Sequence, residues 1–262
     1  SLSGEDITII NEFVEYHKRK GCTKFYIHDN DSEIPLSNYL SEYITSGLVE
    51  YIPTTRSATL EYDSPQLWAK NHALSNFGQY HKWMALLDAD EFIVTDNNMM
   101  IPDVLRDFEG FGGIALNWIN FGSSGLIESP ETVLGPYYTR CEPNFHAKAL
   151  VNPASVHQCR RSHYCDYYYP HISVNIDKEI VPQKTWHSEP DKIKFHKMYI
   201  YHYTIKSLND FKLKQKRGNG GDFAERPDAY FNAVDKSMNR DCPPLLMPPE
   251  LGSKVQERQS LF

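Results

Sequence analysis

A short apolar segment that runs directly into acidic residues constrains this chain more than any other feature of its sequence. Residues 83–87, Trp-Met-Ala-Leu-Leu, have the length of a buried strand rather than that of a helix. Three acids follow, namely Asp88, Asp90 and Glu91. Because burying such carboxylates without partners would cost several kcal/mol each, we expect them at the exit of the strand, facing solvent or a cation.

The spacing of Asp88 and Asp90 suits a metal ion. Two carboxylates at alternate positions of a strand end can reach one oxygen-preferring ion such as Mg²⁺ or Mn²⁺, and such an ion can hold a diphosphate. The alternative is a solvated turn after the strand, and an Asp-x-Asp pair alone does not decide between the two. The choice depends on the residues elsewhere in the chain that accompany the pair.

The first 120 residues alternate between helical and extended patterns. Helical spacing or helix-start signals occur at residues 5–20, 35–47, 64–77 and 102–108, and strand patterns occur at residues 24–28, 49–52, 83–87, 92–94 and 113–119. This alternation predicts an α/β fold with a mostly parallel sheet and helices on both faces. In such sheets ligands bind beyond the carboxyl ends of the strands, where Asp29 and the Asp88/Asp90 pair fall.

The second half of the chain has a different character. Residues 120–190 are rich in Pro, Gly, Tyr, His and Cys and have weak periodicity, which predicts loops and short antiparallel strands laid over the sheet. Regular patterns return as a strand at residues 197–203 and a helix at residues 207–216. The prolines that follow Cys242 predict an extended tail over residues 243–262.

Charge and hydropathy argue against two classes of protein. A net charge of −7 disfavours a general nucleic-acid binder, and no apolar run approaches the ~20 residues of a membrane span. No signal peptide precedes the first helical pattern, so the chain looks like an excised domain whose targeting information is absent.

The cysteines do not form a recognisable framework. Five cysteines, an odd number without a Cys-x-x-Cys pair, argue against a dense set of disulfides. His157 and Cys159, followed by His163 and Cys165, offer possible zinc ligands, but their spacing differs from that of the usual zinc loops. The pattern favours a chance cluster in an aromatic-rich loop over a structural zinc site.

Three further groups of residues carry potential chemistry. His202, near a strand end, could complete an Mn²⁺ site begun by the acids. A basic cluster before a Gly-rich loop could neutralise a diphosphate leaving group, and the aromatic and small polar residues 118–125 suit a sugar acceptor. The basic cluster comprises Lys206, Lys212, Lys214, Lys216 and Arg217. Each group also has an ordinary alternative, namely a packed histidine, a solvated helix face and a turn after a strand.

Taken in order, several segments resemble glycosyltransferase family 92 and its relatives with a GT-A type fold. They are residues 12–17 with Gly21, residues 25–32, 82–93, 118–125 and 148–153, and residues 202–207 leading to Lys216, Arg217, Gly218 and Asp222. The resemblance implies one GT-A type domain over residues 1–242. Its Rossmann-like, nucleotide-sugar-binding half would span residues 1–120, and a smaller mixed or antiparallel acceptor half would span residues 121–242.

The resemblance also implies a metal-dependent transferase that moves a sugar from a nucleotide-sugar donor, a UDP-sugar, to a hydroxyl of a glycan or glycoprotein with inversion. Asp88, Asp90 and His202 would hold Mn²⁺ or Mg²⁺ on the diphosphate. The donor set would be Asp29, Asn30, His72, Asp88, Lys216 and Arg217, and the acceptor set would be Trp118, Phe121, Ser123 and Ser124. The compartment is left open between the cytoplasm and, for a domain excised from a membrane-anchored protein, the Golgi lumen.

Two departures from the family pattern and two other functions stay open. Few residues precede the first helix, where family members have a strand that carries part of the nucleotide pocket, and residues 163–165 read His-Tyr-Cys where a His-x-His-Tyr pattern is usual. Asp222 and Glu128 are candidates for the general base that an inverting transfer needs. A metal-dependent phosphohydrolase or nucleotidyltransferase also uses acids after a strand, and a non-catalytic carbohydrate-binding domain could keep the aromatic loop.

Overall fold

The computed structural model describes residues 6–32, 34–55, 64–182, 190–217 and 226–245. Its α-helices are α1 (Asp6–Arg19), α2 (Ser37–Thr45), α3 (Pro65–Phe77), α4 (Ile101–Leu105), α5 (Leu208–Arg217) and α6 (Asp228–Ser237). Its strands are β1 (Phe25–Asn30), β2 (Val49–Thr54), β3 (Met84–Ala85), β4 (Glu91–Thr95), β5 (Gly113–Phe121), β6 (Arg140–Val151), β7 (Val156–Cys159), β8 (Cys165–Tyr167), β9 (Ser173–Val174), β10 (Met198–His202) and β11 (Arg240–Asp241). Short 3₁₀ turns occur at Gly78–Tyr80, Asp96–Asn98, Arg106–Phe108, Pro153–Ser155 and Pro190–Lys192.

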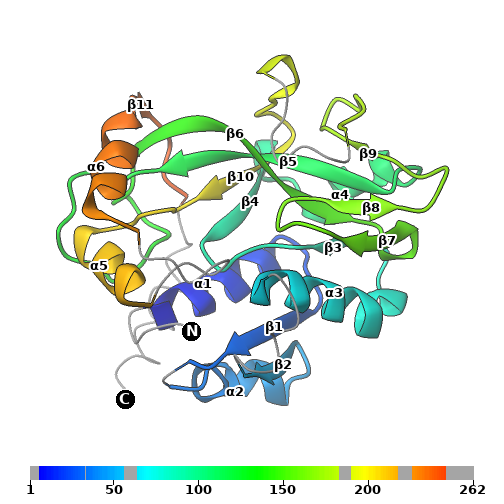
Figure 1. The fold of residues 1–262 in the computed structure, drawn as a ribbon, viewed down its shortest axis with the longest axis horizontal. Helices are drawn as coiled ribbons and strands as arrows, with labels where there is room; N and C mark the ends of the chain where they lie inside the picture. Colours follow the sequence, from blue (N-terminus) through cyan, green and yellow to red (C-terminus); the bar gives the residue numbers. More distant parts are fainter. Residues whose placement is uncertain (1–5, 33, 56–63, 183–189, 218–225, 246–262) are drawn as a thin grey trace.

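The N-terminal part forms a parallel β1–α2–β2 unit with α1 packed beside it (Figure 1). The register runs from Phe25 opposite Val49 to Asn30 opposite Thr54. Buried aliphatic side chains of α1, β1 and α2 make a common core, because each element presents one apolar stripe. Gly21 allows the sharp exit from α1 with a φ of +97°, and its missing Cβ leaves room for Pro102.

The second sheet is mixed and strongly curled (Figure 1). Its seven strands include the path β11-β6-β5-β10-β4, with β3 added on β6 and β9 added on β5. β5 and β6 are antiparallel, while β10 runs parallel to β5 and antiparallel to β4. An α/β class is therefore confirmed, but the sheets of the described residues, of which β7 and β8 make a third, do not form the mostly parallel, Rossmann-like sheet that the sequence predicted.

The reason lies in the pairing of segments that are distant in sequence. The 83–87 segment pairs through Met84 and Ala85 with Val151 and Leu150 of β6, and β4 pairs with β10 from the second half. The strand at residues 197–203 was predicted, but β6 is longer than the short antiparallel strands expected in residues 120–190, and neither pairing was predicted. The helices expected at residues 5–20, 35–47, 64–77 and 207–216 are confirmed, and the one at 102–108 is a short α4 followed by a 3₁₀ turn.

Two buried polar side chains of α1 bind it to the rest of the fold, one to β4 and one to the segment between β5 and β6. His17 accepts the Ile93 N–H through Nε2 at 3.1 Å while its Nδ1 lies 2.9 Å from the carbonyl oxygen of Phe13. Glu12, which is fully buried, accepts the backbone N–H groups of Val133 and Leu134. Since β4 begins directly after the Asp88–Asp90 turn, the His17 contact with Ile93 fixes α1 beside the acids.

Two disulfides occur among the described residues, which is not the dense set that the cysteine count argued against. Cys141 of β6 bonds to Cys242 just after β11, and Cys159 bonds to Cys165 across the β7–β8 hairpin. The second bond uses both cysteine sulfurs of the zinc alternative, which removes its thiolate ligands. Cys22 is a free thiol. None of the described helices combines the length and apolar composition that a membrane span requires.

Candidate functional site

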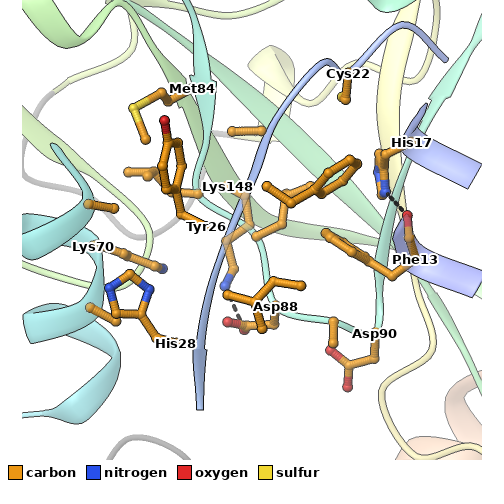
Figure 2. Close-up of a pocket in the computed structure, with 18 of the residues that line it drawn as sticks. Phe13, His17, Cys22, Tyr26, His28, Lys70, Met84, Asp88, Asp90 and Lys148 are labelled. Carbon is orange, nitrogen blue, oxygen red and sulfur yellow. Dashed lines mark hydrogen bonds and ion pairs between the residues drawn. The ribbon is translucent and has the colours of Figure 1, made fainter. Parts of the chain in front are cut away.

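A cavity of about 1100 Å³ lies beside the acidic turn and is lined by α1, β1, α3 and the segment 83–90. Figure 2 shows Phe13 and His17 on one side of β1 and Tyr26, His28 and Lys70 on the other, with Asp88 and Asp90 close together at one end. The wall around Phe13 is largely apolar, while the end that holds the acids is charged. The cavity therefore offers a charged subsite at the exit of the strand, as the sequence predicted.

Asp88 is fixed by two side chains of different elements. Its Oδ2 accepts the Lys148 ammonium of β6 at 2.7 Å, and its Oδ1 accepts the Gln66 amide of α3 at 2.9 Å. The turn is closed locally, because the Asp88 N–H donates to the Glu91 carboxylate at 3.0 Å. Burial by itself would raise the pKa of Asp88, but the ammonium groups of Lys148 and Lys70 lower it to about 2. Asp88 is thus an anion held in one position.

Two buried lysines converge behind Asp88. Lys148 is 1% exposed and also lies 3.2 Å from the fully buried carboxylate of Glu91. Burial opposes its charge, yet Asp88 and Glu91 prevail and raise the pKa of Lys148 above its usual value. Lys70 donates to the carbonyl oxygen of Ser162, and burial together with the Lys148 ammonium lowers the pKa of Lys70. The cluster places two lysine side chains in the wall of the cavity, and Lys148 is the one that stays fully charged at pH 7.

Asp90 has its own set of partners. Its Oδ2 accepts the Lys214 ammonium of α5 at 3.0 Å, and its Oδ1 lies 3.8 Å from Nε2 of His202. Burial opposes ionisation of Asp90, but Lys214 and His202 hold its pKa well below the usual range. Burial lowers the pKa of His202 to about 4, so its imidazole is neutral at pH 7.

The donor chemistry of Asp90 and His202 fits a borderline divalent cation such as Mn²⁺. Nδ1 of His202 faces the Asn120 amide oxygen at 3.1 Å, which assigns the proton to Nδ1 and leaves the Nε2 lone pair on the side of Asp90. Among the described residues there is no group of three or more His, Cys, Asp and Glu side chains arranged to hold a metal. Within the described part of the chain, Asp90 and His202 would supply two ligands, and phosphate oxygens and water would supply others. Both oxygens of Asp88 already have partners.

The predicted donor-binding residues lie in different settings. Asp29 is 4% exposed and accepts the Leu36 N–H and the Tyr51 hydroxyl, so it ties the end of β1 to the start of α2. Asn30 lies at the wall of the cavity, and its Oδ1 is buried without a hydrogen-bond partner in the described part of the chain. His72 stacks on Trp68 of α3. The exposed Lys216 lies on α5, and nothing is described of the Arg217 side chain.

Of the predicted acceptor residues, only Trp118 reaches the cavity. Phe121 is fully buried and packs on Tyr201 and Tyr203, which leaves its ring no surface for a sugar. The buried Ser123 donates its N–H to Asp235, and the Ser124 hydroxyl accepts two backbone N–H groups, so both stabilise the turn after β5.

The described part of the structure does not put either candidate base at the site. Glu128 is exposed and accepts the Asn209 amide at 2.7 Å, away from the cavity wall. Asp222 lies outside the described residues. Lys148, Lys70 and Gln66 are site residues that the functional assignment from sequence missed. A lone lysine within the apolar stretch 147–151 was the available signal for Lys148, because a lysine in a buried strand needs anionic partners.

Comparisons of the sequence with known proteins give evidence of a different kind. The sequence profile of glycosyltransferase family 92 matches residues 3–241, nearly the whole chain. A glycosyltransferase family 92 protein of Oryza sativa subsp. japonica is 26% identical over 152 residues, which cover 55% of this chain and 24% of that protein. The matched region thus spans about a quarter of the length of the rice protein.

Proposed function

Because this chain belongs to glycosyltransferase family 92, we propose that it transfers a sugar from a nucleoside-diphosphate sugar, a UDP-sugar, to a hydroxyl of a glycan. The observation that carries the proposal is the pairing of Asp90 with a neutral His202 at the charged end of the cavity, with Lys214 in contact. A diphosphate is the part of such a donor that needs both a cation and ammonium groups. Binding there would leave the sugar at the cavity wall.

The lysines of the site would act on the leaving group. Negative charge develops on the nucleoside diphosphate as its bond to the sugar breaks, and fixed cations close to that charge lower the barrier. Lys214 stands beside Asp90, and Lys70 lies in the same cavity wall. A bound Mn²⁺ or Mg²⁺, held by Asp90 and His202, would add electrostatic stabilisation of the same charge.

Transfer with inversion needs a carboxylate within hydrogen-bond reach of the acceptor hydroxyl. Asp222 and Glu128 are our candidates for this base. Replacement of the true base by Ala should collapse turnover and leave nucleotide affinity nearly intact. Normal turnover in both variants would exclude both residues from the role.

Calorimetric titration with UDP and with GDP, each in Mn²⁺ and in EDTA, tests the proposal. We expect one nucleotide to bind only with metal, and we expect Asp90→Ala to abolish that binding. Asp103→Ala is a matched control, because Asp103 is an exposed acid of α4 that pairs with the exposed Arg106. Its affinity should equal that of the wild type.

Other outcomes identify other functions. Phosphate release from the nucleotide without a sugar acceptor would indicate a phosphohydrolase. Binding of glycan that needs no metal and is insensitive to Asp90→Ala would indicate a carbohydrate-binding domain. Failure of the wild type to bind either nucleotide in Mn²⁺ would contradict the proposed function.

A further inference from the structure

An irregularity in the β5–β6 pair sets the position of Trp118. Asn117 pairs with Ala147, whereas Trp118 pairs with Asn144, so Phe145 and His146 are extra residues in β6. Such bulges redirect side chains and often occur beside active sites. Asn144 stabilises this one, since its Oδ1 accepts the His146 N–H at 2.9 Å and lies 2.6 Å from the Nδ1 of His146. The bulge is therefore a fixed feature.

The bulge and its neighbours enclose the Trp118 ring. His146 stacks on it with ring centroids 5.4 Å apart, and His202 approaches to 4.3 Å. The Lys148 ammonium lies 5.7 Å from the ring centroid, and the Trp118 residue is 8% exposed. Because its own chain contacts the ring in this way, Trp118 has little free face on which a sugar could stack. These contacts nevertheless hold the ring in one position.

The polar edge of the ring has no partner. Nε1 of Trp118 is buried and makes no hydrogen bond within the described residues. A buried indole N–H usually has an acceptor, because an unpaired donor has lost its water without compensation. Trp118 also lines the cavity. An unpaired donor that is held rigidly in a cavity wall indicates an acceptor oxygen on the ligand.

The surroundings indicate which oxygen this is. Trp118 lies between His202, which approaches Asp90, and Lys148, which binds Asp88. The Trp118 indole is therefore next to the charged end of the cavity but carries no charge itself. His163 also contacts the ring, and burial lowers the pKa of His163 to about 3, so this neighbouring imidazole is neutral at pH 7. A diphosphate favours ammonium groups, whereas a neutral N–H suits a sugar hydroxyl.

We propose that Trp118 is a specificity residue for the donor sugar, with its Nε1–H donating to a hydroxyl oxygen of the sugar. This inference rests on the proposed function, because it needs a nucleotide sugar in the cavity. It differs from the acceptor role that the sequence predicted for this residue. The contact depends on a hydroxyl in one position, so it selects among sugars on the same nucleotide.

The variant Trp118→Phe keeps an aromatic ring and removes only the N–H. Calorimetry would compare free UDP and GDP with a set of UDP- and GDP-linked hexoses and pentoses. For the sugar nucleotide that the wild type binds best, we expect about three- to tenfold weaker binding, which is the size of one neutral hydrogen bond. The free diphosphate should bind as it does to the wild type. Trp68→Phe is the matched control, since Trp68 lies on α3 outside the cavity wall, and it should change neither affinity.

A second measurement follows ligand binding in the wild-type protein and uses the variant only to assign one signal. The four tryptophans of the chain give indole N–H signals in a ¹⁵N-labelled protein, and the Trp118 signal is the one that Trp118→Phe removes. We expect it to move downfield when the sugar nucleotide binds and to stay in place with the free diphosphate.

The possible results distinguish a failure of this inference from a failure of the proposed function. Equal weakening of the free diphosphate and the sugar nucleotide would assign the oxygen to the diphosphate and overturn the inference. Unchanged affinity and an unmoved indole signal would overturn it too, while the proposed function would stand. A wild type that binds none of the nucleotides would refute the proposed function, and this inference with it.

Discussion

Replacing Lys148 with Met tests whether one buried ammonium group holds the acidic turn together. The side chain of Lys148 is 1% exposed and lies 2.7 Å from Asp88 and 3.2 Å from Glu91. Met fills a similar volume, so the variant removes the charge without opening a large cavity. It leaves the carboxyl groups of Asp88 and Glu91 without their shared cation.

The size of the effect follows from the exposure of the two acids. Removing one member of a buried ion pair costs about 3–5 kcal/mol, because the other charge is left without a partner. Asp88 is 30% exposed and keeps the Gln66 amide, so water can compensate for part of its loss. Glu91 is fully buried, and burial raises its pKa, so it can take up a proton. We therefore expect a loss of about 3 kcal/mol at pH 7, at the lower end of that range.

Urea unfolding followed by tryptophan fluorescence, with both disulfides oxidised, measures the free energy of unfolding. Lys212→Met is the control, because Lys212 and its partner Asp228 are 44% and 65% exposed; exposed pairs contribute about 0–1 kcal/mol. Adding Glu91→Gln to the Lys148→Met variant removes one of the stranded acids and should restore at least about 1 kcal/mol. If Lys148→Met cost no more than Lys212→Met, our account of the charge cluster would be refuted.

Three further predictions concern the stability of the fold. Burial raises the pKa of Glu12 from 4.5 to about 7, so the contribution of Glu12 to the free energy of unfolding is full below pH 4.5 and is lost as the pH rises through 7. In urea titrations, the stability advantage of the wild type over Glu12→Gln should fall by about 3 kcal/mol over that interval. Burial lowers the pKa of His17 from 6.5 to about 4, so the contribution of His17 to the free energy of unfolding is present above pH 6.5 and is lost as the pH falls through 4. The wild type should lose about 3 kcal/mol over this interval in urea titrations, and a His17→Gln protein should not show this loss. Replacing Cys159 and Cys165 together by Ser should cost about 2 kcal/mol through the freed loop, seen as a lower Tm with the other disulfide intact; an unchanged Tm would show that the hairpin needs no crosslink.

Local sequence signals predicted the helices well. α3 begins at Ser64 and Pro65, where the extended backbone of Ser64 and the fixed φ of proline start a helix without further help. α1 ends before Gly21, whose positive φ few other residues adopt. Such signals act within a few residues, so they are readable from the chain alone.

Strand pairing and burial could not be predicted in the same way. β6 begins at Arg140 and pairs with β3 from residue 84, while Cys141 finds its disulfide partner 101 residues away. No periodicity within either segment specifies the other. Trp118 and Phe121 could not be distinguished from the sequence for the same reason. Both are aromatic residues of one strand, and only the fold places Trp118 at the cavity and Phe121 in the core.

Asp88 and Asp90 look equivalent in sequence, yet the structure gives them different partners. Asp88 is bound to Lys148, which is too deeply buried to reach water, so removing Asp88 would leave that cation with Glu91 alone and disturb the fold along with any ligand site. Asp90 is bound to Lys214, whose side chain is 19% exposed and can turn toward solvent. Loss of Asp90 therefore changes the electrostatics of the cavity with less damage to the protein. This difference makes Asp90→Ala the informative variant for metal and nucleotide binding, while effects of replacing Asp88 would mix binding with stability.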